Sequence, residues 1–190
     1  MSFEALVLAC ATTAELRAAR RAGARAALVG LGAVNGVPDG PLVSFGLAGA
    51  LRDDLPSGTV LDATRVVDGE GAVLWQGELL GVEGARPATI LAADEVVDDP
   101  AERRRLHERT GADAADLESG PLARTGRMRG VLRAVSDTPT HRLGGVAEGA
   151  TADGEVDYLG FLRGFAREPL VTVRAAVGAR RALKGLEAIV

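Results

Sequence analysis

Short apolar runs alternate with amphipathic and polar segments along most of the chain. Continuous apolar runs indicate buried strands, and apolar positions at helical spacing indicate helices. This pattern predicts strands over residues 4–10, 26–29, 42–45, 58–67, 89–92, 112–117 and 131–135, with an extended hairpin over 72–80. It predicts helices over residues 14–22, 100–111, 119–127, 158–166 and 170–186. Strands and helices in alternation predict a three-layer α/β/α sandwich around a mixed central sheet.

Capping and turn residues set the expected limits of these elements. Thr12 or Thr13 suits the N-cap of the first helix, and Pro100 suits the first turn of another. Glycines follow two of the predicted helices, at Gly23 and Gly111, as is typical of a helix end. Residues 46–50 are glycine-rich and are predicted as a loop after the strand, where a ligand can approach the backbone.

Composition narrows the class of protein. The 190 residues suit one α/β domain, with 47% hydrophobic residues, 3% aromatic residues and a net charge of −4. Since there is no basic region with interleaved aromatics, we expect no nucleic-acid partner. No apolar segment reaches the roughly 20 residues that span a membrane, so no membrane span is expected. The single cysteine, Cys10, is compatible with a reducing compartment, and we expect a cytoplasmic protein.

Two groups of arginines lie on predicted helices, one around Arg20 and one over Arg103, Arg104 and Arg105. A run of like charges on a helix usually marks a solvated face, so both groups are predicted to face water. The two histidines, His107 and His141, are far apart and have no metal-ligand spacing, so we expect no metal site.

Three carboxylates stand at the ends of two predicted strands. Asp116 and Glu118 follow one strand, and Asp137 follows the next. In a parallel α/β sheet consecutive strands end at the same edge, which is where ligands bind. We therefore expect Glu118 and Asp137 to face one pocket. Two carboxylates in one pocket can divide into an ionised acceptor and a proton donor.

Three motifs occur in a characteristic order: FGLAGAL at 45–51, ADLE at 115–118 and RAVSD at 133–137. The chain resembles the purine nucleoside phosphorylase and nucleosidase superfamily in these motifs. The resemblance is strongest to the hopanoid-associated phosphorylase (adenosylhopane nucleosidase) branch, which shares the DxES run at 116–119 and the DGEVD tail at 153–157. The methylthioadenosine/S-adenosylhomocysteine nucleosidase branch is also related. The resemblance covers nearly all of residues 1–190 and implies one domain.

The resemblance implies roles for two of the carboxylates. Asp137 matches the aspartate that donates a proton to the purine and makes it a better leaving group, which requires a raised pKa and therefore burial. Glu118 matches the glutamate that binds the ribose hydroxyls. The alternatives are an Asx turn for Asp137 and a solvated helix-terminal side chain for Glu118.

Further site residues follow from the same resemblance. Glu15 falls in register with the glutamate that activates water in the nucleosidases, although a glutamate in the first turn of a helix also has a dipole explanation. Val96 and Val97 match the segment that contacts the base, with Val96 where relatives place an aromatic. The remaining predicted substrate-binding residues are Gly46, Ala48, Gly49, Leu117, Ser136 and Arg133. Arg133 is expected either to hold Asp137 or to form a surface ion pair.

The implied function is cleavage of the N-glycosidic bond of an adenosine-type nucleoside, with no cofactor. Hydrolysis and phosphorolysis both remain open, with phosphate as the co-substrate in the second case, near the amides of Gly32 and Gly46. The 5′ substituent, methylthio, homocysteine or hopanoid, also stays open. Relatives carry a helix where this chain has only the short stretch 33–41. That shortage points to an open pocket, to completion by a partner subunit, or to a non-catalytic nucleoside-binding or scaffold protein. A homodimer is expected from the resemblance.

Overall fold

The computed structural model describes residues 5–140, 143, 153–154 and 168–188. Its strands are β1 Val7–Cys10, β2 Ala26–Leu28, β3 Leu42–Ala50, β4 Val60–Val67, β5 Val73–Gln76, β6 Arg86–Ala92, β7 Ala114–Asp116 and β8 Met128–Asp137. Its helices are α1 Thr13–Arg21, α2 Pro100–Thr110, α3 Ser119–Arg124 and α5 Pro169–Glu187, with a short 3-10 helix η2 at Leu31–Ala33. The helix predicted over 158–166 lies outside the described residues.

The strands form one mixed sheet with the order β2-β1-β3-β7-β6-β4-β5, and β8 pairs with both β3 and β4. Because β8 bridges these two strands, the pairs β3–β7, β7–β6, β6–β4, β4–β8 and β8–β3 close into a ring. Strand β3 pairs with two strands along one edge. Strand β1 pairs with its first half, and β7 pairs with its last two residues. The expected mixed central sheet with helices around it is confirmed.

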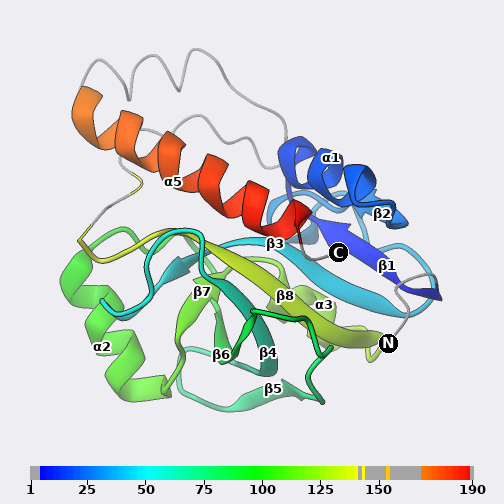
Figure 1. The fold of residues 1–190 in the computed structure, drawn as a ribbon. Coiled ribbons are helices and arrows are strands. Elements are labelled where there is room, and N and C mark those ends of the chain that lie inside the picture. The colour runs from blue at the N-terminus through cyan, green and yellow to red at the C-terminus, as the bar shows by residue number, and fades with distance from the viewer. Residues whose placement is uncertain (1–4, 141–142, 144–152, 155–167, 189–190) are drawn as a thin grey trace.

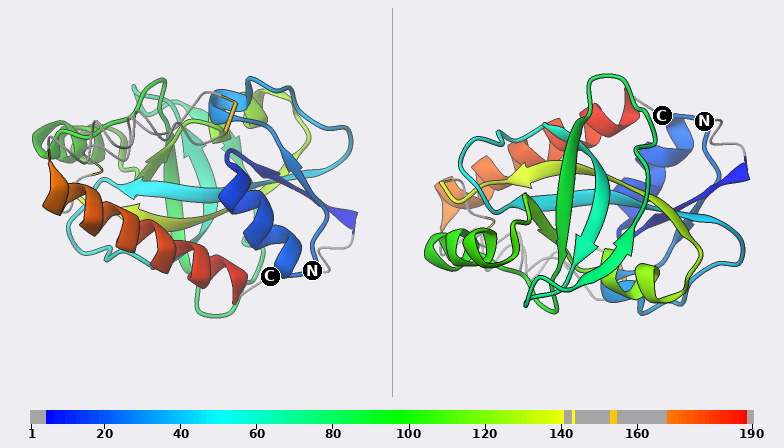
Figure 2. Two further views of the ribbon diagram at one scale, coloured as in Figure 1. Left: turned by 90° about the horizontal axis from the view of Figure 1, so that it is seen from above. Right: turned by 90° about the horizontal axis from the view of Figure 1, so that it is seen from below.

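Helices cover the sheet from two sides. Helices α1 and α5 lie side by side (Figures 1 and 2), α1 over β2, β1 and β3 and α5 over β8 and β3. Arg21 of α1 and Glu187 of α5 form an ion pair at 2.8 Å. Helix α3 packs on β4, β5 and β6 from the other side. The buried hydrophobic residues that the structure describes form three clusters, two of which lie on opposite faces of the sheet. Phe45 and Leu132 pack under α1 and α5, whereas Leu42, Val131 and the α3 residue Leu122 pack on the opposite side.

The capping residues act as the sequence predicts. Thr12 caps α1 by accepting a hydrogen bond from the Glu15 amide, and the Glu15 carboxylate accepts one from the Thr12 amide, which completes a capping box. Asp99 caps α2, Pro100 occupies its first turn, and Gly111 ends it at a positive φ of 69°. No helix among the described residues is both long and apolar enough to cross a bilayer.

Two expectations about the sheet were wrong. The loop predicted over 46–50 is strand, because β3 continues to Ala50 by pairing with β8 on one edge and β7 on the other. Strands β7 and β8 do not end at one edge of a parallel sheet either, since β7 runs antiparallel to β3 and β8 runs parallel to it. Their ends nevertheless meet one pocket, because both strands flank the same half of β3.

Candidate active site

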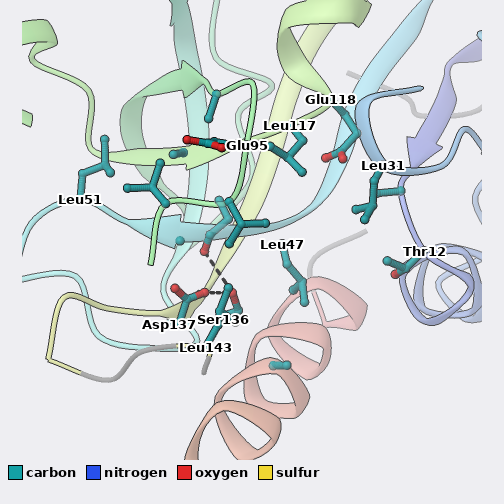
Figure 3. A pocket seen from close by; sticks show the side chains of 18 of the residues that line it. Thr12, Leu31, Leu47, Leu51, Glu95, Leu117, Glu118, Ser136, Asp137 and Leu143 are labelled. Atoms are coloured by element: carbon teal, nitrogen blue, oxygen red, sulfur yellow. Dashed lines mark hydrogen bonds between the residues drawn. The ribbon is translucent and has the colours of Figure 1, made fainter. Parts of the chain in front are cut away.

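A pocket of about 350 Å³ lies above the second half of β3. Its walls come from α1, η2, the loop after β6, the loop after β7 and the end of β8, with Ala179 of α5 below (Figure 3). Among the predicted site residues, those that line it are Glu15, Ala48, Gly49, Val96, Val97, Leu117, Glu118, Ser136 and Asp137. Gly46 and Arg133 do not line it and lie behind its wall. One pocket therefore collects side chains from segments that are far apart in the sequence.

Asp137 stands at one end of this pocket and is almost completely buried. One carboxylate oxygen accepts a hydrogen bond from the Ser136 hydroxyl, and the other accepts one from the guanidinium of Arg103. Burial raises the pKa of Asp137, while Arg103 and Ser136 act in the opposite direction. The net upward direction is the one that a proton donor near neutral pH requires.

Arg103 contradicts the expectation of a solvated arginine face. Its side chain is only 1% exposed, whereas those of Arg104 and Arg105 are 50% and 74% exposed. The sequence does predict this burial when helical spacing is considered together with charge. Arg103 lies three residues before Leu106 and seven before Thr110, both buried, so helical periodicity places it on the inner face of α2.

Glu118 and Glu15 stand at the other end of the pocket. Glu118 Oε1 accepts a hydrogen bond from the Gly32 amide at 3.2 Å. Burial raises the pKa of Glu118 to about 8, with Arg133 lowering it and Asp116 raising it further. Glu15 Oε1 accepts a hydrogen bond from the Leu47 amide at 2.7 Å. Burial also raises the pKa of Glu15, against the influence of Arg133.

Arg133 is completely buried beneath these glutamates and does not hold Asp137. Its Nε lies 2.6 Å from Asp116 Oδ2, an ion pair without hydrogen-bond alignment, and its Nη2 lies 3.3 Å from Glu118 Oε2. Both expectations for Arg133 were therefore wrong. Arg133 lies four residues before Asp137 on β8, and its guanidinium contacts Asp116 and Glu118 instead. One guanidinium thus serves a cluster of three buried carboxylates, Glu15, Asp116 and Glu118.

Gly46 creates the space for this cluster. A Cβ at this position would lie 2.3 Å from Glu15 Oε1 and 2.7 Å from Arg133 Nη1. The glycine therefore admits side chains of the protein beneath the strand, and this contact, rather than ligand approach, explains it. Gly49 has the same role at the other end of the pocket. A Cβ at this position would lie 3.0 Å from Asp137 Oδ2.

Strand β3 sets the distance between the two ends. Arg133, whose Nη2 contacts Glu118, pairs with Gly46, and Asp137 pairs with Gly49 after a register shift in β8. These two positions of β3 are three residues apart, or about 10 Å. Leu47 lies between Asp137 and Glu118 in the view of Figure 3. The arrangement offers a buried acid at one end, carboxylate acceptors at the other, and an apolar stretch between them.

The described residues contain no group of three or more side chains suited to hold a metal ion. No protein-family model and no curated protein matches the sequence. Solved structures do match. Futalosine hydrolase of Helicobacter pylori aligns with a TM-score of 0.58 at 13% identity, over 97% of each chain. The chain has the nucleosidase fold.

Two further solved structures agree with this fold. The 5′-methylthioadenosine/S-adenosylhomocysteine nucleosidase of Campylobacter jejuni aligns with a TM-score of 0.55 at 19% identity, over 98% of this chain and 100% of that one. The corresponding nucleosidase of S. pneumoniae aligns at 0.54 and 14% identity, over 96% and 98%. The nucleosidase fold expected from the three motifs is thereby confirmed.

Proposed function

We propose that this protein is a nucleosidase that hydrolyses the N-glycosidic bond of an adenosine-type nucleoside. One observation carries the proposal: Asp137 and a pair of buried glutamates stand at opposite ends of one apolar pocket, next to β3 residues that are about 10 Å apart. That separation suits a nucleoside with its base toward Asp137 and its ribose toward Glu118. The three motifs and the nucleosidase fold agree with this placement.

In the proposed reaction the bond between ribose C1′ and purine N9 breaks, and its electron pair leaves with the base. Asp137 donates its proton to the purine ring and so neutralises the leaving group. Glu118 accepts hydrogen bonds from the ribose hydroxyls and stabilises positive charge that develops on the sugar. Water adds to C1′ and gives its proton to Glu15. The products are the free base and the free sugar.

The charges at the sugar end favour water over phosphate as the nucleophile. Glu15 and Glu118 line this end, and Arg133 lies beneath them, already paired with carboxylates. Among the described residues that line the pocket, the cation is Arg103, which stands at the other end beside Asp137. Among the described residues a phosphate dianion would therefore find no free cation at the sugar end to offset the cost of burying its charge.

The apolar lining gives a preference for the 5′ substituent. Leu31 and Leu47 line the pocket close to the sugar end. Apolar walls favour an uncharged group, such as methylthio or the hopanoid of the branch that the motifs resemble, over the charged amino acid of homocysteine. We further propose that the protein is a homodimer, as the resemblance implies, and that it acts in the cytoplasm, with which its single cysteine is compatible.

The test is release of free adenine from methylthioadenosine, S-adenosylhomocysteine, adenosine and adenosylhopane, with and without phosphate. We expect release that needs no phosphate and that falls at least 100-fold in Asp137→Asn, which removes the acid. Release that requires phosphate would identify a phosphorylase instead. Tight binding of these nucleosides without release would favour the second candidate, a non-catalytic nucleoside-binding protein.

A further inference from the structure

Arg103 connects three walls of the pocket at the base end. Its Nη2 donates to Asp137 Oδ2 at the end of β8, and its Nη1 donates to the Ala50 carbonyl at the end of β3, at 3.2 Å. Its Nε donates to the Val97 carbonyl in the loop after β6, at 2.8 Å. One planar guanidinium thus joins the acid, the floor and the loop beside the base end.

This arrangement is more than a neutral packing contact. A buried guanidinium carries a large desolvation cost, which is offset only when its geometry is good and its donors are satisfied. A buried methionine or leucine would fill similar space without that cost. What only the guanidinium offers is a rigid fork of donors that fixes several acceptors at once. The acceptors here are the acid itself and the carbonyl of the loop that lines the base end.

We propose that Arg103 is a positioning residue for bond cleavage, holding the Asp137 carboxylate in place and fixing the Val97 loop relative to it. This inference rests on the proposed function, in which Asp137 is the acid. Arg103 itself transfers no proton. It acts through Asp137, because the carboxylate is confined between the guanidinium and the Ser136 hydroxyl.

The charges around Asp137 define the test. Among the described residues, Arg103 faces it from α2, and Asp98, 3.9 Å from Arg103 Nη2, and Glu95 come from the loop after β6. Strand β3 contributes Gly49, which carries no charge. Arg103 lowers the pKa of Asp137, and Asp98 raises it. Removing the guanidinium must therefore move the pKa of Asp137 upward.

The first measurement needs no activity. The Asp137 carboxyl is titrated by ¹³C NMR in protein labelled with [4-¹³C]aspartate, and its signal is assigned by its loss in Asp137→Asn. We expect Arg103→Met to raise the pKa of Asp137 and Arg103→Lys to keep it close to wild type. Arg104→Met is the matched control, because this half-exposed neighbour pairs with Asp53 instead. An unchanged pKa in Arg103→Met overturns the inference.

The second measurement is the pH profile of turnover. In Arg103→Met we expect the alkaline limb to move to higher pH, and kcat to fall about 100-fold, the loss typical of a misplaced group. Lysine supplies the positive charge but not the planar set of donors. Arg103→Lys should therefore keep the alkaline limb at its wild-type pH, while its kcat still falls. If Arg103→Met does not fold, as judged by near-UV circular dichroism, Arg103→Lys alone decides: wild-type kcat in this variant overturns the inference.

The two proposals fail in different ways. If the wild type cleaves no nucleoside, the proposed function fails, and the NMR titration still decides whether Arg103 controls Asp137. If the wild type cleaves a nucleoside and Arg103→Met keeps both its alkaline limb and its kcat, the proposed function stands and the inference about Arg103 is refuted.

Discussion

Replacing Arg133 by methionine tests the buried charge cluster at the sugar end without any assumption about activity. Methionine fills much of the same volume but leaves Glu15, Asp116 and Glu118 without their cation. Removing one partner of a buried ion pair costs about 3–5 kcal/mol. A domain has only about 5–15 kcal/mol of stability in all, so the loss should be large but measurable.

The sign of the pH dependence follows from the pKa values. Arg133 lowers the pKa of both Glu15 and Glu118, so its loss raises them further. The folded variant then holds protons that the unfolded chain releases above its ordinary carboxyl pKa. Folded wild type also holds the Glu118 proton up to about pH 8, so for this group the two proteins differ only above that pH. There the stability of the variant falls below that of wild type by about 1.4 kcal/mol more per pH unit for each proton that only the variant still holds. The destabilisation of Arg133→Met relative to wild type should therefore grow between pH 8 and pH 9.5.

The assay is urea unfolding followed by far-UV circular dichroism at pH 6.5, 8 and 9.5. Arg105→Met serves as the control, because its side chain is 74% exposed and its contact with Glu102 is a surface pair. Such a change is expected to alter stability by less than about 0.5 kcal/mol at every pH. A destabilisation of Arg133→Met relative to wild type that is equal at pH 6.5 and pH 9.5 would refute the reasoning about the cluster.

Three other changes have defined outcomes. The folded-state pKa of Glu118, about 8, exceeds its unfolded value, so wild type should lose stability from pH 5 to pH 8. Glu118→Gln should reduce this loss in urea unfolding; an unchanged dependence of stability on pH would contradict this. Gly49→Ala should lower kcat roughly tenfold with a stability loss of about 1 kcal/mol or less, because its Cβ would press on Asp137 Oδ2 at 3.0 Å; wild-type kinetics would speak against that contact. Asp62→Asn should cost about 1–3 kcal/mol in thermal unfolding and leave nucleoside cleavage intact, because Asp62 accepts hydrogen bonds from the Leu80 and Gly81 amides and does not line the pocket.

The sequence predicted most of the elements and most of the pocket. Apolar runs located the strands, and capping residues such as Thr12 and Pro100 located helix starts. The three motifs located Asp137 and Glu118, which line one pocket as expected. These features are local: each depends on a short stretch of chain whose pattern is visible in the sequence.

The errors came from features that depend on distant parts of the chain. Glycines at 46 and 49 look like a loop, but β3 continues because β7 and β8 supply hydrogen-bond partners far along the sequence. Arg103 looks solvated beside Arg104 and Arg105, yet its acceptors lie on β3, β8 and the loop after β6. Local charge and glycine content do not reveal such partners.

The closed ring of strands has a consequence for folding. Strand β8 seals the ring by pairing Leu42 with Met128 and Val60 with Ala134, partners that are far apart in sequence. Closing loops of this length costs entropy before the contacts repay it, which slows folding. Arg133, Ser136 and Asp137 all lie on β8, the last strand of the ring to be synthesised. The pocket therefore cannot assemble ahead of the ring, and the appearance of the proposed nucleoside binding during refolding should report closure of the ring.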